Sequence, residues 1–165
     1  MCGFQVLPTD PPRASRRGLI MTAAALLFRI GCLLAFLAVS FGAFGAHALG
    51  ATLQASNMTS VYETGVQYAF YHSAPTIGIG ALLSLPGCPH QRALCIAGIL
   101  FVCGTVLFSG SLFALALSGI DAIGIITPFG GLAFLIGWVI LMVRGPAALA
   151  RHGAESSNAR LLPVR

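Results

Sequence analysis

Long uncharged stretches dominate the pattern of hydrophobic and polar positions along this 165-residue chain. A helix that crosses a membrane needs about 20 mostly apolar residues, and each stretch contains a segment of that size once its polar ends are trimmed. The uncharged stretches are 30–62, 64–91, 93–120 and 122–143. The segments within or at their edges are 28–47, 64–85, 93–118 and 122–143.

These four segments have the character of helices. Backbone polar groups cannot stay unpaired in lipid, so a spanning segment is either a helix or a strand of a closed barrel. Barrel strands alternate polar and apolar side chains over about ten positions, whereas these segments are longer and continuously apolar. We therefore predict an all-α fold, an integral membrane four-helix bundle over residues 28–144. Residues 1–27 are predicted to be a disordered extension rich in arginine and proline, and residues 145–165 a disordered tail.

Arginines at the ends of the segments indicate the orientation of the bundle. They lie before or at the start of the first segment, between the second and third, and after the fourth: Arg13, Arg16, Arg17, Arg29, Arg92, Arg144, Arg151, Arg160 and Arg165. The other two connections, 48–63 and 119–121, carry only Glu63 and Asp121 as charged residues. By the positive-inside rule, we expect both termini and the middle connection in the cytoplasm.

Composition supports a membrane protein and argues against two other classes. The chain is 57% hydrophobic and 8% charged, whereas a soluble domain uses about 25% charged residues to cover its surface. The formal net charge is +5. However, the arginines flank apolar spans and do not interleave with aromatic residues, so we do not expect nucleic-acid binding.

The cysteines suggest neither disulfides nor a strong metal motif. None of the five forms a C-x-x-C pair, and the predicted orientation places Cys2 and Cys88 in the reducing cytoplasm. Cys88-Pro89-His90 offers two metal ligands in one short loop. A structural zinc ion takes four, so a plain turn is the favoured interpretation.

The amino-terminal region allows two further interpretations. Ser15 to Ile20 resembles the start of a twin-arginine export signal, and Ala46-His47-Ala48 resembles a cleavage site. Three more segments follow, and arginines before a first helix are expected from orientation alone, so a retained helix is favoured. Met21 is an alternative start, because the membrane-spanning pattern needs nothing before Arg29.

Polar side chains inside or at the ends of membrane segments are costly, which makes each a functional hypothesis. They gather toward the predicted outer half of the bundle: His47, Glu63, Gln67, Tyr68, His72, Ser109, Ser111 and Thr127. Positions 63, 67 and 71 are spaced i, i+4, i+8, so Glu63, Gln67 and Tyr71 are expected to share a helix face, and positions 68 and 72 form a neighbouring i, i+4 pair. At a 1.5 Å rise per residue, His72 and Ser109 both lie roughly 13 Å below the outer boundary.

We expect those two side chains to meet in a hydrogen bond between helices. A proton or ligand site there is the alternative, disfavoured because no carboxylate accompanies His72 inside the membrane. His47 is expected to form a hydrogen bond at the end of the first helix and to tie it to the second near Glu63. Proton sensing by His47 is the other possibility.

Cofactor binding and catalysis are not expected. Two histidines on different helices suggest haem, but His47 lies near the boundary and His72 well inside, so the pair is poorly placed for one iron. Ser109 with His72 imitates a nucleophile and base, yet the chain has no G-x-S-x-G turn and its outer carboxylates lie at the boundaries.

Small residues and one tryptophan complete the picture of a compact bundle. Small side chains let helix backbones approach closely in lipid. The candidate packing positions are Gly42, Gly45, Ala46, Gly110, Gly130, Gly131 and Gly137. Trp138 lies six residues before Arg144, where an anchor at the inner interface is expected.

Four motifs, one in each segment, resemble a known family. They are FGAFGAH (41–47), TGVQY (64–68) continuing to His72, LFSGSL (107–112), and TPFGG (127–131) continuing to Trp138. Their order and spacing resemble the domain-of-unknown-function 423 family, small bacterial inner-membrane proteins similar to animal transmembrane protein 256. The resemblance covers about residues 29–144 and implies four transmembrane helices. It implies no substrate, cofactor or catalytic residue, and the residues before Met21 depart from the family pattern.

From residues and resemblance together we expect a multi-pass protein of the bacterial inner membrane without enzymatic activity. Its expected role is interaction or assembly within the membrane, or organisation of membrane lipid. The expected partners are lipid and either another membrane protein or a second copy of the chain. The alternative is a small transporter or channel subunit with an outward-facing polar path around His72.

Overall fold

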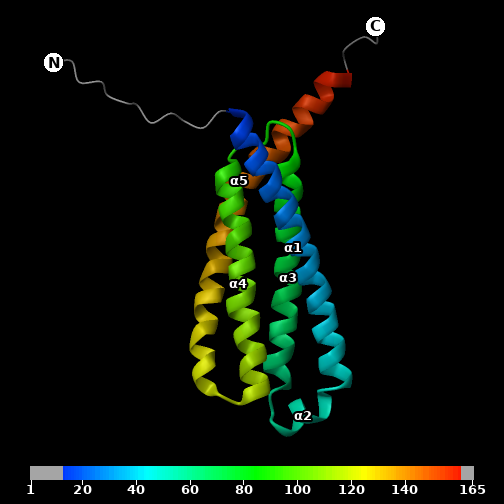
Figure 1. Ribbon diagram of the computed structural model, residues 1–165, viewed down its shortest axis with the longest axis vertical. Helices are drawn as coiled ribbons and strands as arrows, with labels where there is room; N and C mark the ends of the chain where they lie inside the picture. Colours follow the sequence, from blue (N-terminus) through cyan, green and yellow to red (C-terminus); the bar gives the residue numbers. More distant parts are fainter. Residues whose placement is uncertain (1–12, 161–165) are drawn as a thin grey trace, which may run out of the picture.

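The computed structural model describes the backbone of residues 13–160 and the side chains of residues 18–151, and within that range every regular element is helical. The elements are α1 (Arg13–His47), α2 (Gly50–Ala55), α3 (Thr59–Ser84), α4 (Gln91–Ser118), the 3-10 helix η1 (Asp121–Ile126) and α5 (Thr127–Arg160). The four long helices run alternately up and down. The start of α1 and the end of α5 therefore lie at one end of the molecule, and α2 lies at the other (Figure 1).

The long helices pack chiefly as a row rather than as a closed square. α3 packs against α1 on one side and α4 on the other, and α4 packs in turn against α5. α1 and α5 therefore flank the row, with α3 and α4 between them (Figure 1). This arrangement gives α3 two extensive helix neighbours and leaves part of its surface facing a hollow beside α5.

Three helical segments are long and apolar enough to cross a membrane: Gly18–His47, Gln91–Ser118 and Asp121–Arg151. Their mean hydropathy lies between 2.1 and 2.2. α3 has the length of a span but not the same apolar character, because it carries His72, Pro75 and several tyrosines and hydroxyl residues. The four long helices were expected from the sequence, whereas composition identifies three of them as candidate spans.

Close backbone approach holds neighbouring helices together at defined points. A Cβ added at Gly80 of α3 would lie 2.6 Å from the backbone nitrogen of Phe28 in α1. A Cβ added at Gly130 of α5 would lie 2.5 Å from the backbone nitrogen of Phe108 in α4. Only a residue without a side chain fits at either crossing, and this is how helices gain packing contacts where lipid supplies no hydrophobic drive.

Both ends of the helical domain extend further than the sequence suggested. The first helix was expected from residue 28, but α1 begins at Arg13, and Ala24 and Leu27 are buried in the core. The last helix was expected to end at residue 143, but α5 continues to Arg160, and Ala148 is buried in the same core cluster. Residues 13–27 and 144–160 are therefore helical rather than disordered, and where side chains are described there, Ala24, Leu27 and Ala148 pack in the core. The rest of the predicted extension and tail, residues 1–12 and 161–165, lies outside the described residues.

Candidate functional site

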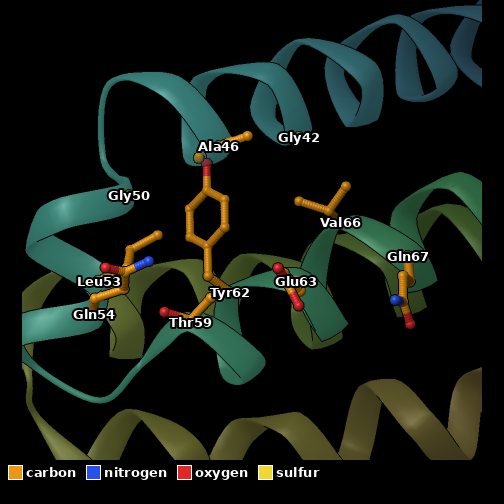
Figure 2. A pocket seen from close by; sticks show the side chains of 11 residues that line it. Gly42, Ala46, Gly50, Leu53, Gln54, Thr59, Tyr62, Glu63, Val66 and Gln67 are labelled. Carbon is orange, nitrogen blue, oxygen red and sulfur yellow. The ribbon is translucent and has the colours of Figure 1, made fainter.

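A pocket of about 300 Å³ opens between the end of α1, the short helix α2 and the start of α3 (Figure 2). We call it the α2 pocket. Space for it exists because α1 presents only small side chains there, and the polar groups come from α2 and α3. Its lining residues are Gly42, Gly45, Ala46, Gly50, Leu53, Gln54, Thr59, Tyr62, Glu63, Val66 and Gln67.

Tyr62 joins α3 to α1 at this pocket. Its hydroxyl donates a hydrogen bond to the carbonyl oxygen of Phe41 at 2.9 Å, and its ring lies against Gly45, where an added Cβ would collide with it. The ring also contacts Phe113 of α4, with centroids 5.1 Å apart. Gly45 of the FGAFGAH motif thus leaves space for the aromatic ring of Tyr62 in α3, the next long helix.

The expected link through His47 is not found in the part of the chain that the structure describes. His47 is exposed at the last residue of α1, and no hydrogen bond or ion pair joins it to Glu63. Its place as the connector of the two helices is taken by Tyr62. The predicted face of Glu63, Gln67 and Tyr71 is found only in part: Glu63 and Gln67 line the α2 pocket, whereas Tyr71 lies at a hollow on another side of α3, because an i, i+8 spacing drifts around the helix.

The imidazole of His72 is held by two hydrogen bonds on the other side of α3. Its Nε2 accepts a hydrogen bond from the indole Nε1 of Trp138 at 3.2 Å, and its Nδ1 lies 2.8 Å from the carbonyl oxygen of Tyr68. An indole N–H is a donor only, so Nε2 must be unprotonated and Nδ1 must carry the proton. The two contacts therefore fix His72 as one neutral tautomer.

Aromatic rings surround this histidine and continue to the surface. His72 stacks on Phe134 with centroids 3.4 Å apart and planes 7° apart, and Tyr68 stacks on Phe108 with centroids 4.4 Å apart. Beside them lies a hollow of about 770 Å³ between α3 and α5. We call this surface the aromatic groove. Its lining residues are Tyr68, Tyr71, His72, Phe108, Pro128, Gly131, Leu132, Phe134, Leu135 and Trp138.

Two expectations about this region are corrected by the geometry. His72 does not pair with Ser109, whose hydroxyl is buried and has no hydrogen-bond partner in the structure. Trp138 does not use its N–H as an interface anchor, because that group is bonded to His72 between helices. These outcomes depend on how α4 and α5 are rotated against α3, which the spacing along one helix does not specify.

Ser111 and Thr127 are the remaining polar residues predicted from the sequence. Ser111 and Thr127 share a hydrogen bond of 2.7 Å that links α4 to the start of α5.

Of the predicted packing residues, Gly42, Gly130 and Gly137 face close neighbours, and Gly131 makes only ordinary contact with Phe108. Gly110 and Ala46 differ from expectation: nothing lies within 4 Å of a Cβ added at Gly110, and Ala46 is exposed beside the α2 pocket. Close approach occurs instead at positions not predicted: Gly31, Gly65, Gly80, Gly98 and Gly104.

The Cys88-Pro89-His90 loop has the geometry of a turn. Cys88 is buried in the core, whereas His90 is exposed with a positive φ of 54° just before α4. Burial, and to a smaller extent the charge of Cys95, raises the pKa of the Cys88 thiol. A metal-binding thiol must lose its proton, so the loop disfavours that state. Within the described residues, no three His, Cys, Asp or Glu side chains are grouped to hold a metal ion.

The segments that build the α2 pocket and most of the aromatic groove match a known protein family. The pattern of the family described as "Protein of unknown function (DUF423)" matches residues 41–131, from the end of α1 to the start of α5. The chain belongs to the DUF423 family. The match includes the residues of both surfaces except the end of the groove beyond Gly131.

Relatives of this DUF423 protein are named as membrane proteins. It is 41% identical over 115 residues to the UPF0382 membrane protein YwdK of Bacillus subtilis, covering 69% of this chain and 90% of YwdK. It is 37% identical over 124 residues to the UPF0382 inner membrane protein YgdD of Escherichia coli K12, covering 73% of this chain and 88% of YgdD. No solved structure matches this DUF423 chain. Its apolar helices and these relatives together make it a membrane protein.

Proposed function

We propose that this protein crosses the bacterial inner membrane four times, with both termini in the cytoplasm, and binds another membrane protein through the aromatic groove without catalysing a reaction. The inner membrane is supported by the similarity to YgdD, which is named as an inner membrane protein. A spanning role for α3 is supported by its 26 residues, about 39 Å at 1.5 Å per residue, and by its place between α1 and α4. The orientation is supported by the arginines, which avoid both connections at the α2 end.

The single observation that carries the interaction role is the exposure of Tyr71. It is 59% exposed, and its hydroxyl has no hydrogen-bond partner among the described residues. It lies eight residues beyond Glu63, about 12 Å into the span. A polar group facing hydrocarbon is costly unless it is paired, so a partner that brings an acceptor to this surface gains stability from it.

The absence of catalysis is supported by the state of His72. Both ring nitrogens take part in hydrogen bonds, so the imidazole has no free lone pair to act as a base. The transporter alternative has less support for a related reason. His72 is 5% exposed and stacked on Phe134, which places apolar and aromatic groups where a polar path would need water.

Site-directed photocrosslinking in cells tests the interaction. A photoreactive phenylalanine analogue at position 71 is expected to give a discrete protein adduct whose mass distinguishes a second copy from another protein. The matched control is position 36, an aromatic site on α1 that is 67% exposed away from the groove. The same adducts at both positions, or none at position 71, would contradict the proposal.

A further inference from the structure

The carboxylate of Glu63 lies at the α2 pocket without a counter-charge. It has no hydrogen bond or ion pair among the described residues. Of the arginines whose side chains are described, Arg29 lies about 27 Å from the end of α1 along the helix axis, and Arg92, Arg144 and Arg151 lie toward the opposite end of the molecule. The C-terminal end of α1 adds partial negative charge beside the pocket and the N-terminal ends of α2 and α3 add partial positive charge, so the full charge of Glu63 sets the sign of the local field. The local field therefore favours a cation.

The other polar groups of the pocket suit a donor-rich cation. Figure 2 shows the side chains of Gln54, Thr59 and Glu63 around the ring of Tyr62. The amide and hydroxyl oxygens are hydrogen-bond acceptors, and an ammonium group has three N–H donors and no acceptor.

The size and composition of the pocket narrow the class of ligand. A volume of about 300 Å³ admits a headgroup or a small amine. A divalent metal ion such as Ca²⁺ takes six to eight oxygen ligands, whereas Glu63 is the one carboxylate among the pocket's lining residues. An anion would face that carboxylate without a compensating arginine or lysine in the lining.

We propose that the α2 pocket binds a ligand carrying a free ammonium group, with Glu63 as its counter-charge. The group is presented either by an aminophospholipid headgroup or by a small amine in solution. This inference goes beyond the proposed function, because the α2 pocket and the aromatic groove have different lining residues on different sides of α3.

Two measurements on the full chain distinguish the sources of the ammonium group. In the first, the protein is released from nanodiscs containing equal amounts of phosphatidylethanolamine and phosphatidylglycerol, and retained lipid is measured by native mass spectrometry. In the second, ethanolamine is titrated into the protein in detergent at constant NaCl, and thermal unfolding is followed by the fluorescence of Trp138, the single tryptophan. Retention of phosphatidylethanolamine in the first identifies the lipid source, and stabilisation in the second identifies the free amine.

Glu63→Gln is the deciding variant, and Asp121→Asn is its matched control. Asp121 is an exposed carboxylate on η1, outside the pocket lining, so removing its charge leaves the pocket intact. We expect Glu63→Gln to weaken binding about tenfold, as for the loss of a charge-assisted hydrogen bond, and Asp121→Asn to bind like the wild type. Ala46→Leu, which fills the pocket without changing its charge, is expected to block binding as well.

The proposal is overturned if Glu63→Gln binds as tightly as the wild type, or if the wild type neither retains phosphatidylethanolamine in preference to phosphatidylglycerol nor is stabilised by ethanolamine. Photocrosslinking at position 71 in the Glu63→Gln variant distinguishes a failure of ammonium binding from a failure of the proposed protein interaction. Unchanged adducts there, with lost ammonium binding, would support the pocket and the groove as independent sites.

Discussion

At the scale of single residues, His72 and Trp138 show how a polar pair is accommodated between membrane helices. The indole N–H and the imidazole Nε2 satisfy each other, and the second ring nitrogen uses a carbonyl oxygen of its own helix. Stacking on Phe134 covers one face of the imidazole. The pair therefore joins α3 to α5, two helices whose backbones come close at few points.

A double-mutant cycle with Trp138→Phe and His72→Phe measures the energy of that bond. Both variants keep an aromatic ring, so stacking is largely retained while the hydrogen bond is lost. We expect a coupling of about 0.6–2 kcal/mol in the free energy of unfolding, the range for hydrogen bonds between membrane helices. Unfolding is followed by circular dichroism, because Trp138→Phe removes the single tryptophan. Additive effects of the two substitutions would show that the contact contributes no stability.

Sequence reasoning identified one partner in this pair and missed the other. His72 stood out as a histidine in an apolar segment, and its i, i+4 relation to Tyr68 is reproduced by the backbone bond. Trp138 lies 66 residues further along the chain, so no local spacing connects the two. Its distance from Arg144 indicated a place near the interface but not which way the indole points, since that depends on how α5 rotates against α3.

At the scale of elements, α4 and α5 illustrate how glycine sets the distance between helices. Gly104 and Gly130 face each other, and a Cβ added at Gly130 would lie 2.9 Å from the carbonyl oxygen of Gly104. The Ser111–Thr127 hydrogen bond closes the same pair of helices one to two turns away. Close backbone packing at the glycines and a side-chain hydrogen bond nearby thus both hold α4 against α5.

Gly130→Ala and Gly131→Ala form a matched pair that tests this crossing. At Gly130 the added methyl group meets backbone atoms of Phe108, which cannot move without separating the helices. At Gly131 the nearest atom is 3.7 Å away on a side chain, an ordinary contact. We expect Gly130→Ala to lower the free energy of unfolding by about 1–3 kcal/mol, the usual cost of overpacking, and Gly131→Ala to leave it nearly unchanged. Equal thermal stability of the two variants would contradict the close crossing.

Sequence reasoning located the centres of the long helices better than their ends or their neighbours. The segment expected at 64–85 is α3 (Thr59–Ser84), and the segment at 93–118 is α4 (Gln91–Ser118). The start of α1 was missed because its arginines were treated as flanking residues, although Ala24 and Leu27 still pack. The short helix α2 has too few apolar residues to be seen in a search for spans.

At the scale of the whole molecule, the charge distribution divides the two ends. The described part of α1 begins, and α5 ends, at the end that also carries Arg92. The opposite end carries Glu63 and Asp121, and Glu63 lies at the α2 pocket. α3 connects these ends through the centre of the row, so whether it spans decides the topology of the whole chain.

Reporter fusions after residues 55, 89 and 165 test that topology directly. If all four long helices cross the membrane, residue 55 lies outside, and residues 89 and 165 lie in the cytoplasm, as the arginines indicate. A fluorescent protein that matures in the cytoplasm is then expected to be bright at 89 and 165 and dark at 55, and alkaline phosphatase to give the reverse pattern.

If only the three most apolar segments cross, residues 55 and 89 lie on the same side and residue 165 remains there too, because two spans separate it from residue 89. The position of residue 89 relative to residue 55 therefore decides between the two: opposite sides indicate four spans and the same side indicates three. Opposite sides for residues 55 and 89 require α3 to cross despite its histidine, proline and tyrosines, which is feasible because its buried face lies against α1 and α4 rather than lipid.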